Sequence, residues 1–206
     1  MPQSSHFSRN VFINCPFDED YNTLFSALIF TVYKCGFKPR CALEMDDATE
    51  SRLEKILRII DDCKYGIHDI SRVELNENDL PRFNMPFELG LFYGCKRFGA
   101  NLNKYKMALV LEREQYRYQQ YISDIAGIDP KAHGNDVPNV IRIVRNWLMQ
   151  ASKRTTLPGH VRIRNSYSSF IDDLPDILSA AGLEDEGLLF NDLCLLIEEW
   201  INKNLE

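Results

Sequence analysis

The chain has 206 residues, of which 45% are hydrophobic and 26% charged, and its formal net charge at pH 7 is −6. These values fit one globular domain, or one domain with a small helical addition. The negative charge argues against general binding to nucleic acid or to an anionic membrane, since both require basic surfaces. No stretch approaches the roughly 18 apolar residues of a membrane span, and the first ten residues lack the apolar centre of a signal peptide.

Six cysteines are scattered along the chain without a C-x-x-C pair or the Cys/His spacing of a metal site. Most lie within apolar segments, where a free cysteine behaves as a small hydrophobic residue. We therefore expect a reducing, cytoplasmic compartment, no metal and no structural zinc.

The first half of the chain alternates short apolar runs with helical patterns. Residues 11–15 predict a buried strand, and acidic residues at 18–20 open a helix. Residues 37–43 predict a second strand, which Pro39 places toward a sheet edge. Ser51 begins a capping box before the next helix.

Two further strands and a helix follow. Residues 64–70 and 107–111 predict the third and fourth strands, and a helix between them starts at Pro86 and ends near Gly99. Strands that alternate with helices of this length indicate βαβ units and a mainly parallel sheet. Right-handed crossovers then predict an open, doubly wound sheet of order 2-1-3-4. Residues 122–128 are a candidate fifth strand at the edge.

The remaining chain is predicted to be helical. Residues 138–148, 166–181 and 184–203 have helical patterns, and Asp136 is a good N-cap for the first of them. We expect an α/β domain over residues 1–152 and a helical extension over 153–206. The extension packs either on this domain or on a second subunit. The loop with Tyr116, Tyr118 and Tyr121 is either a lid or an interface.

Ligands of open α/β sheets bind beyond the carboxyl ends of the strands, where the strand order reverses. Here that point lies between the first and third strands. Residues 14–17 follow the first strand, residues 69–71 end the third, and Glu88 lies in the helix after it. We expect these three groups to converge on one crevice. The sequence lacks G-x-G-x-x-G, the P-loop motif and G-x-S-x-G, which argues against dehydrogenases, P-loop NTPases and acyl transfer.

Glu88 is the main catalytic candidate. In the first turn of an otherwise buried helix, the helix dipole would keep its carboxylate ionised, as a nucleophile or as a stabiliser of a developing cation. The Gly90 and Gly94 pair would allow another element to approach closely. The plainer interpretation is that Glu88 is only a helix-start charge.

The other candidates have plainer interpretations too. Asp69 would hold a sugar hydroxyl or act as acid/base if Glu88 raised its pKa, or it is a capping aspartate. Asn14 would bind a ribose or form a turn, and Phe17 would stack on a base or belong to the core. Arg52 would meet a phosphate at a helix start or lie on the surface. His68 would be a satisfied core histidine or a catalytic one, while His133 lies in a loop that could reach the crevice rim.

Three segments in this order carry a family resemblance: residues 11–17 (VFINCPF), 65–71 (YGIHDIS) and 86–90 (PFELG). Over about residues 10–112 the chain resembles the nucleoside 2-deoxyribosyltransferase-like proteins and, more distantly, the TIR domains. The resemblance implies a flavodoxin-like sheet and a helical glutamate that attacks or supports the anomeric carbon of a nucleoside or NAD.

Carried onto this chain, the resemblance gives Glu88 the place of the catalytic glutamate and Asp69 that of the aspartate at the end of the third strand. The substrate-binding candidates are Asn14, Cys15, Pro16, Phe17, Arg52, Ser71 and Asn84. The family has acidic and small residues before the glutamate, where this chain has Arg82-Phe83-Asn84-Met85. This departure suits a substrate phosphate, or a protein that binds nucleotides without turnover.

The resemblance thus predicts cleavage or transfer of an N-glycosidic bond of a nucleoside, nucleotide or NAD. The alternative is a TIR-like nucleotide-sensing module in bacterial signalling or defence. The family resemblance also implies a homo-oligomer and no cofactor, with NAD only as a substrate.

Overall fold

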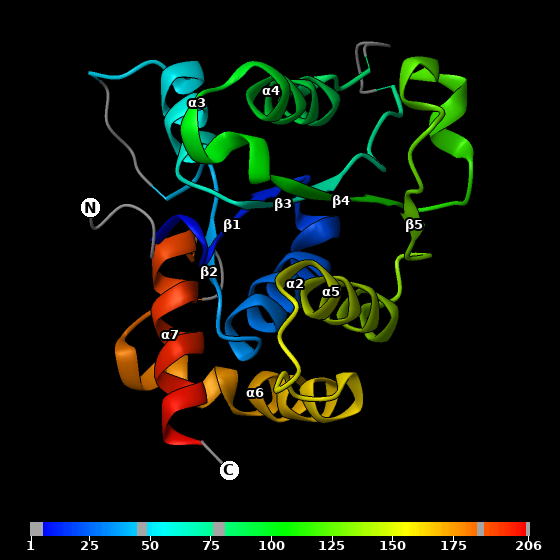
Figure 1. Cartoon of the computed structure of the whole chain (residues 1–206). Coiled ribbons are helices and arrows are strands. Elements are labelled where there is room, and N and C mark those ends of the chain that lie inside the picture. The colour runs from blue at the N-terminus through cyan, green and yellow to red at the C-terminus, as the bar shows by residue number, and fades with distance from the viewer. Residues whose placement is uncertain (1–5, 45–48, 76–80, 185–187, 205–206) are drawn as a thin grey trace.

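In the computed structural model, which describes residues 6–44, 49–75, 81–184 and 188–204, five strands form one parallel sheet. The strands are β1 (Asn10–Asn14), β2 (Lys38–Arg40), β3 (Tyr65–Asp69), β4 (Met107–Glu112) and β5 (Lys131–Ala132). Their order is β2-β1-β3-β4-β5, and all four pairings are parallel (Figure 1). The predicted α/β class, the order 2-1-3-4 and the edge position of the Pro39 strand are confirmed.

Helices cover both faces of the sheet. One face carries α3 (Arg52–Asp61) and α4 (Asn84–Phe98), and the other carries α2 (Asn22–Lys34) and α5 (Val137–Ser152) (Figure 1). Of the C-terminal helices, α6 (His160–Ala181) packs on α2 and α5, and α7 (Phe190–Lys203) packs on α2 and α6, at the side of the molecule where β2 lies. Among the described residues, no helix combines the length and apolar character needed to cross a membrane.

The alternation of side chains along β3 decides which residues can meet. Tyr65 and Ile67 point into the main core with α2 and α5. Gly66 and His68 point to the opposite face, where both lie against Phe92 of α4. Because successive strand residues face opposite sides, Asp69 belongs with Ile67, on the side away from α4.

Helix starts agree with the sequence only in part. The capping box of Ser51 and Glu54 is present at the start of α3, as predicted. In contrast, α4 begins at Asn84, so Pro86 is its third residue and Glu88 its fifth. The predicted place of Glu88 in the first turn is therefore wrong.

The close approach predicted at Gly90 and Gly94 is also wrong. A Cβ added at either position would meet nothing within 4 Å. Close contact occurs instead at Gly66 of β3, where an added Cβ would lie 2.6 Å from the Nε2 atom of His68.

The predicted edge strand at 122–128 is wrong as well. A short 3₁₀ helix (Ser123–Ile125) occupies this stretch, and the edge strand is β5. Further 3₁₀ helices span Glu19–Tyr21, Asn101–Tyr105 and Arg117–Gln120.

The C-terminal helices share one core with the α/β part. Phe30 of α2 packs against Tyr167, Phe170 and Trp200 at ring-centroid distances of 5.4, 5.5 and 5.8 Å. Helix α6 begins six residues before the predicted start, and α7 begins at Phe190 rather than at 184. Residues 185–187 of the predicted helix lie outside the described residues.

Candidate functional site

Glu88 is a buried acidic residue that lies near the C-terminal ends of the sheet strands. Only 6% of the residue is exposed. Burial raises the pKa of Glu88 from an ordinary 4.5 to about 7, and the positive charge of Arg52 offsets only part of this effect. The prediction of a permanently ionised carboxylate is therefore wrong, because near pH 7 the group is divided between its acid and its base form.

The surroundings of Glu88 come from three loops or helix starts. Arg52 is exposed at the first position of α3. Cys15 follows β1 and Cys41 follows β2, and burial raises the pKa of both thiols, with a smaller contribution from the Glu88 charge. Within the described residues, no hydrogen bond or ion pair to the Glu88 carboxylate is present. Among the described residues, the Glu88 carboxyl group is thus influenced by burial and by the charge of Arg52, and by no hydrogen bond.

Asn14 joins β1 to the start of α4. Its Nδ2 group donates to the carbonyl oxygen of Met85 at 2.8 Å and lies 3.0 Å from the Nδ1 atom of His68. Since a carbonyl only accepts, the amide must present its nitrogen to both partners, and Nδ1 of His68 must be unprotonated. Asn14, which was predicted to bind a ribose or to form a turn, is therefore a buried residue whose amide links β1 to the backbone of α4 just before Glu88.

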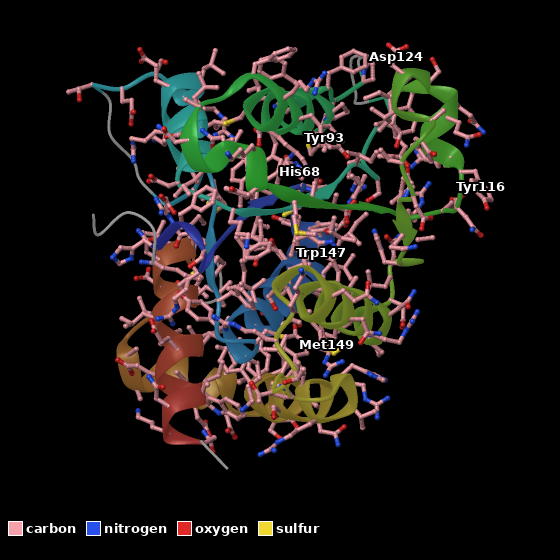
Figure 2. The ribbon with its side chains drawn as sticks, viewed as in Figure 1. His68, Tyr93, Tyr116, Asp124, Trp147 and Met149 are labelled. Carbon is pink, nitrogen blue, oxygen red and sulfur yellow. The ribbon has the colours of Figure 1, made fainter. Side chains whose placement is uncertain are left out.

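His68 is a neutral histidine of the core, but the predicted satisfaction of both ring nitrogens is only half correct. Burial lowers its pKa to about 3, and its ring lies edge-on to Phe92 with a centroid distance of 4.9 Å. With Nδ1 accepting from Asn14, the proton sits on Nε2, which has no hydrogen-bond partner among the described residues. Figure 2 shows His68 beside the sheet.

The carboxylate of Asp69 points away from Glu88, and both of its oxygen atoms accept hydrogen bonds from protein groups. Its carboxylate accepts hydrogen bonds from the Tyr21 hydroxyl, from Nε2 of His133 at 3.0 Å, and from the backbone N–H (3.0 Å) and hydroxyl of Ser71. Burial alone would raise the pKa of Asp69, but the hydrogen bonds outweigh it and hold the pKa below its usual range. The expected raised pKa of Asp69 is therefore wrong, so the condition on which an acid/base role was predicted for it is not met.

Ser71, His133 and Asp69 do not form a nucleophilic triad. Both Oγ of Ser71, at 3.4 Å, and Oδ2 of Asp69, at 3.0 Å, face the same Nε2 atom of His133. The other nitrogen, Nδ1, accepts the backbone N–H of Asn135 at 3.0 Å. Nε2 therefore carries the proton that Asp69 accepts and cannot act as a base toward Ser71.

The remaining predicted site residues lie at separate places near the C-terminal ends of the strands. Pro16 is buried, and Asn84 is exposed as the first residue of α4. Phe17 is turned toward α2, where it packs edge-to-face on Phe25 at a centroid distance of 5.4 Å. Of the predicted binding residues, Cys15 and Arg52 influence the charge state of this neighbourhood, and Asn84 lies one helical turn before Glu88 on α4.

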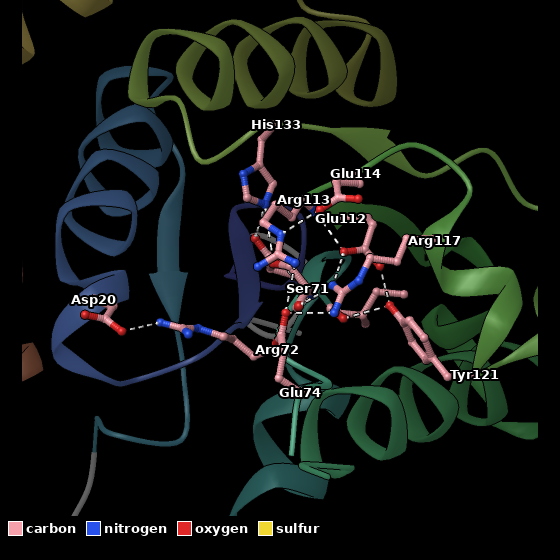
Figure 3. A network of polar contacts seen from close by, with 12 residues as sticks. Asp20, Ser71, Arg72, Glu74, Glu112, Arg113, Glu114, Arg117, Tyr121 and His133 are labelled. Atoms are coloured by element: carbon pink, nitrogen blue, oxygen red, sulfur yellow. Dashed lines mark hydrogen bonds and ion pairs between the residues drawn. The ribbon is translucent and has the colours of Figure 1, made fainter. Parts of the chain in front are cut away.

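A second polar cluster beside the edge, around Glu112, escaped the sequence reasoning (Figure 3). Glu112 is 1% exposed and accepts from Nη1 of Arg117 at 3.2 Å and from the Tyr121 hydroxyl. Arg117 also binds the backbone oxygen of Ser71 at 2.7 Å and the carboxylate of Glu74 at 2.8 Å. The sequence signal for this cluster was an acidic residue that ends an apolar strand.

The tyrosine loop is divided between core and surface. Tyr118 is 1% exposed and belongs to a small core with Ile70 and Leu89. Tyr116 is 63% exposed and points away from the molecule (Figure 2). Tyr118 and Tyr121 thus anchor this loop, while Tyr116 lies at the surface.

Comparison of the chain with family models, with curated proteins and with solved structures gave no match in any of the three. Among the described residues, no group of three or more His, Cys, Asp or Glu side chains could hold a metal ion.

Proposed function

We propose that the chain cleaves or transfers the N-glycosidic bond of a nucleoside, a nucleotide or NAD, with Glu88 acting at the sugar. The observation that carries this proposal is a carboxyl group with a pKa of about 7, buried at the edge of the sheet where open α/β folds bind ligands. The proposal also rests on the resemblance of residues 10–112 to the deoxyribosyltransferase-like and TIR proteins.

A pKa near 7 gives Glu88 both forms that this chemistry needs. Breaking the bond between the sugar carbon and the base nitrogen builds positive charge on the sugar, and the carboxylate form stabilises or traps it. When Glu88 begins in the acid form, it donates its proton to the departing base and is left as the carboxylate that faces the sugar cation. When it begins as the carboxylate, the base takes its proton from water. Water then adds to the sugar carbon in hydrolysis, or a second base adds in transfer.

Arg52 is the candidate ligand for a substrate phosphate. It stands exposed at the first position of α3, where backbone N–H groups and the helix dipole also favour an anion. Its charge reaches Glu88, since it lowers the pKa of that group. A phosphate on Arg52 would place the sugar of a nucleotide near the carboxyl group.

A second candidate function is nucleotide sensing without turnover, by a TIR-like module. It is favoured by the hydrogen bonds that occupy Asn14, Asp69 and Ser71 within the protein. These bonds leave Glu88 without a second acid/base group from that set. In either function we propose a cytoplasmic homo-oligomer that binds neither nucleic acid nor membrane, in keeping with the net charge of −6.

The test is base release from NAD and from a panel of nucleosides and nucleotides, by the wild type and by Glu88→Gln. We expect the variant to lose about a thousandfold in rate, as for removal of an acid/base group, while it keeps its fold and its ligand affinity. Glu199→Gln, an exposed carboxylate on α7, is the matched control and should retain full activity. Equal base release by Glu88→Gln would reject the catalytic role, and ligand binding without any base release would support sensing.

A further inference from the structure

A large cavity lies beside the loop that follows β1, on the side of α2, α6 and α7 and not on the side of Glu88. It has a volume of about 910 Å³ and opens where α6 and the start of α7 meet α2. This volume is within the range of small-molecule sites, which are mostly apolar with a few polar groups. The described lining includes Phe17 and Leu43 from loops, Phe25 from α2 and Phe190 from α7.

The apolar wall of the cavity is aromatic. Phe17 packs edge-to-face on Phe25, whose ring lies 6.1 Å from that of Phe190 at an interplanar angle of 37°. Phe17, Leu43 and Ile171 line this cavity while being 36%, 43% and 39% exposed. A flat apolar ligand would cover these surfaces and stack on the rings.

Arg164 gives the cavity a charge. Of the described residues that line it, Arg164 is the one with a charged side chain, and the exposed Asn165 lies next to it on α6. No ion pair or hydrogen bond to the Arg164 side chain is present within the described part of the chain. In contrast, Arg72 and Arg113 at the edge of the sheet both form ion pairs with carboxylates. An unpaired cation beside an apolar wall attracts an anion, even though the whole chain is negative.

We propose that this cavity binds a small aromatic anion, with its ring against Phe17, Phe25 and Phe190 and its negative group on Arg164. The site is separate from Glu88 and does not depend on N-glycosidic chemistry. It is nevertheless joined to Glu88 by the short loop in which Cys15 lies near that carboxyl group and Phe17 lines the cavity.

The test is a fluorescence titration with anilinonaphthalene sulfonate, an aromatic anion, and with the uncharged N-phenylnaphthylamine. We expect saturable binding of one sulfonate per chain, weakened about tenfold by Arg164→Gln, since a charged hydrogen bond contributes about that factor. The uncharged probe should bind wild type and Arg164→Gln equally. Arg97→Gln, an exposed arginine on α4, removes the same charge elsewhere and should leave both affinities unchanged.

Three results would overturn the proposal. The first is sulfonate binding that does not saturate, and the second is equal sulfonate affinity in the wild type and Arg164→Gln. The third is a dimer in sedimentation that Phe17→Ser dissociates, because a second copy of the chain would then occupy the cavity. Arg164 is exposed, and an unchanged circular dichroism spectrum of its variant shows that the comparison concerns folded protein.

Discussion

At the scale of single residues, burial changes Glu88 in a way that stability measurements can detect without any substrate. Its pKa is about 7 in the folded chain and about 4.5 when exposed in the unfolded chain. The unfolded state therefore loses its proton first as the pH rises. The contribution of Glu88 to the free energy of unfolding decreases between pH 4.5 and 7 and stays low above pH 7.

We predict that Glu88→Gln stabilises the protein at pH 8 and has a much smaller effect, of about 1 kcal/mol or less, at pH 5. A shift of this size corresponds to about 3 kcal/mol at pH 8, because each pKa unit corresponds to about 1.4 kcal/mol. Urea unfolding at both pH values measures the difference. Glu199→Gln should change the free energy of unfolding by less than about 0.5 kcal/mol at either pH. An equal effect of Glu88→Gln at pH 5 and pH 8 would show that Glu88 titrates at its ordinary pKa.

For single residues of the site, some positions could be predicted from the sequence and others could not. The strand order alone placed the loop after β1 and the helix of Glu88 at the same end of the sheet, and Cys15 of that loop does lie near Glu88. The orientation of Asp69 was also available, because alternation along β3 places Asp69 on the side of Ile67. Its partner His133 could not be predicted, since a loop histidine 64 positions away gives no sequence signal of such a contact.

At the scale of elements, the contact of β3 with α4 depends on the absence of a side chain at Gly66. A Cβ there would lie 2.6 Å from Nε2 of His68 and 2.9 Å from the ring of Phe92. Both neighbours are fully buried, so neither can move into open space. The strand and the helix that carries Glu88 are thus fitted to each other at this position.

We predict that Gly66→Ala destabilises the protein by about 2 kcal/mol, as overpacking of a core does. Gly90→Ala is the matched change, since it adds the same methyl group to an exposed position of α4 where nothing lies within 4 Å. It should stabilise the protein by about 0.5–1 kcal/mol through helix propensity. Denaturant midpoints of the two variants should move in opposite directions. Equal stability of the Gly66→Ala variant and the wild type would mean that β3 and α4 are not closely packed.

Element boundaries followed from the sequence where local chemistry determines them. The capping box at Ser51 and the N-cap at Asp136 were both readable, and both helices begin there. The edge strand Lys131–Ala132 was missed because two residues are too few to show any periodicity. Its position comes from pairing with β4, a contact between distant segments.

At the scale of the whole molecule, the C-terminal helices complete the core rather than add a second one. Phe30 of α2 has Tyr167, Phe170 and Trp200 as ring partners, and all three come from α6 and α7. Their removal would leave a fully buried ring of the α/β part facing water. The boundary near residue 152 therefore separates two kinds of architecture that share one hydrophobic core.

We predict that both parts unfold together, and the two tryptophans of the chain can report on each. Trp147 of α5 packs against Tyr65 of β3 at a centroid distance of 6.0 Å, whereas Trp200 of α7 packs against Phe30. In Trp200→Phe only Trp147 fluoresces, and in Trp147→Phe only Trp200 does. Within each variant, the fluorescence midpoint in urea should coincide with the midpoint from far-ultraviolet circular dichroism. A Trp200 midpoint clearly below the dichroism midpoint of the same variant would show that α6 and α7 unfold first. The extension would then be an independent unit, and the aromatic contacts of Phe30 would contribute little to the stability of the α/β part.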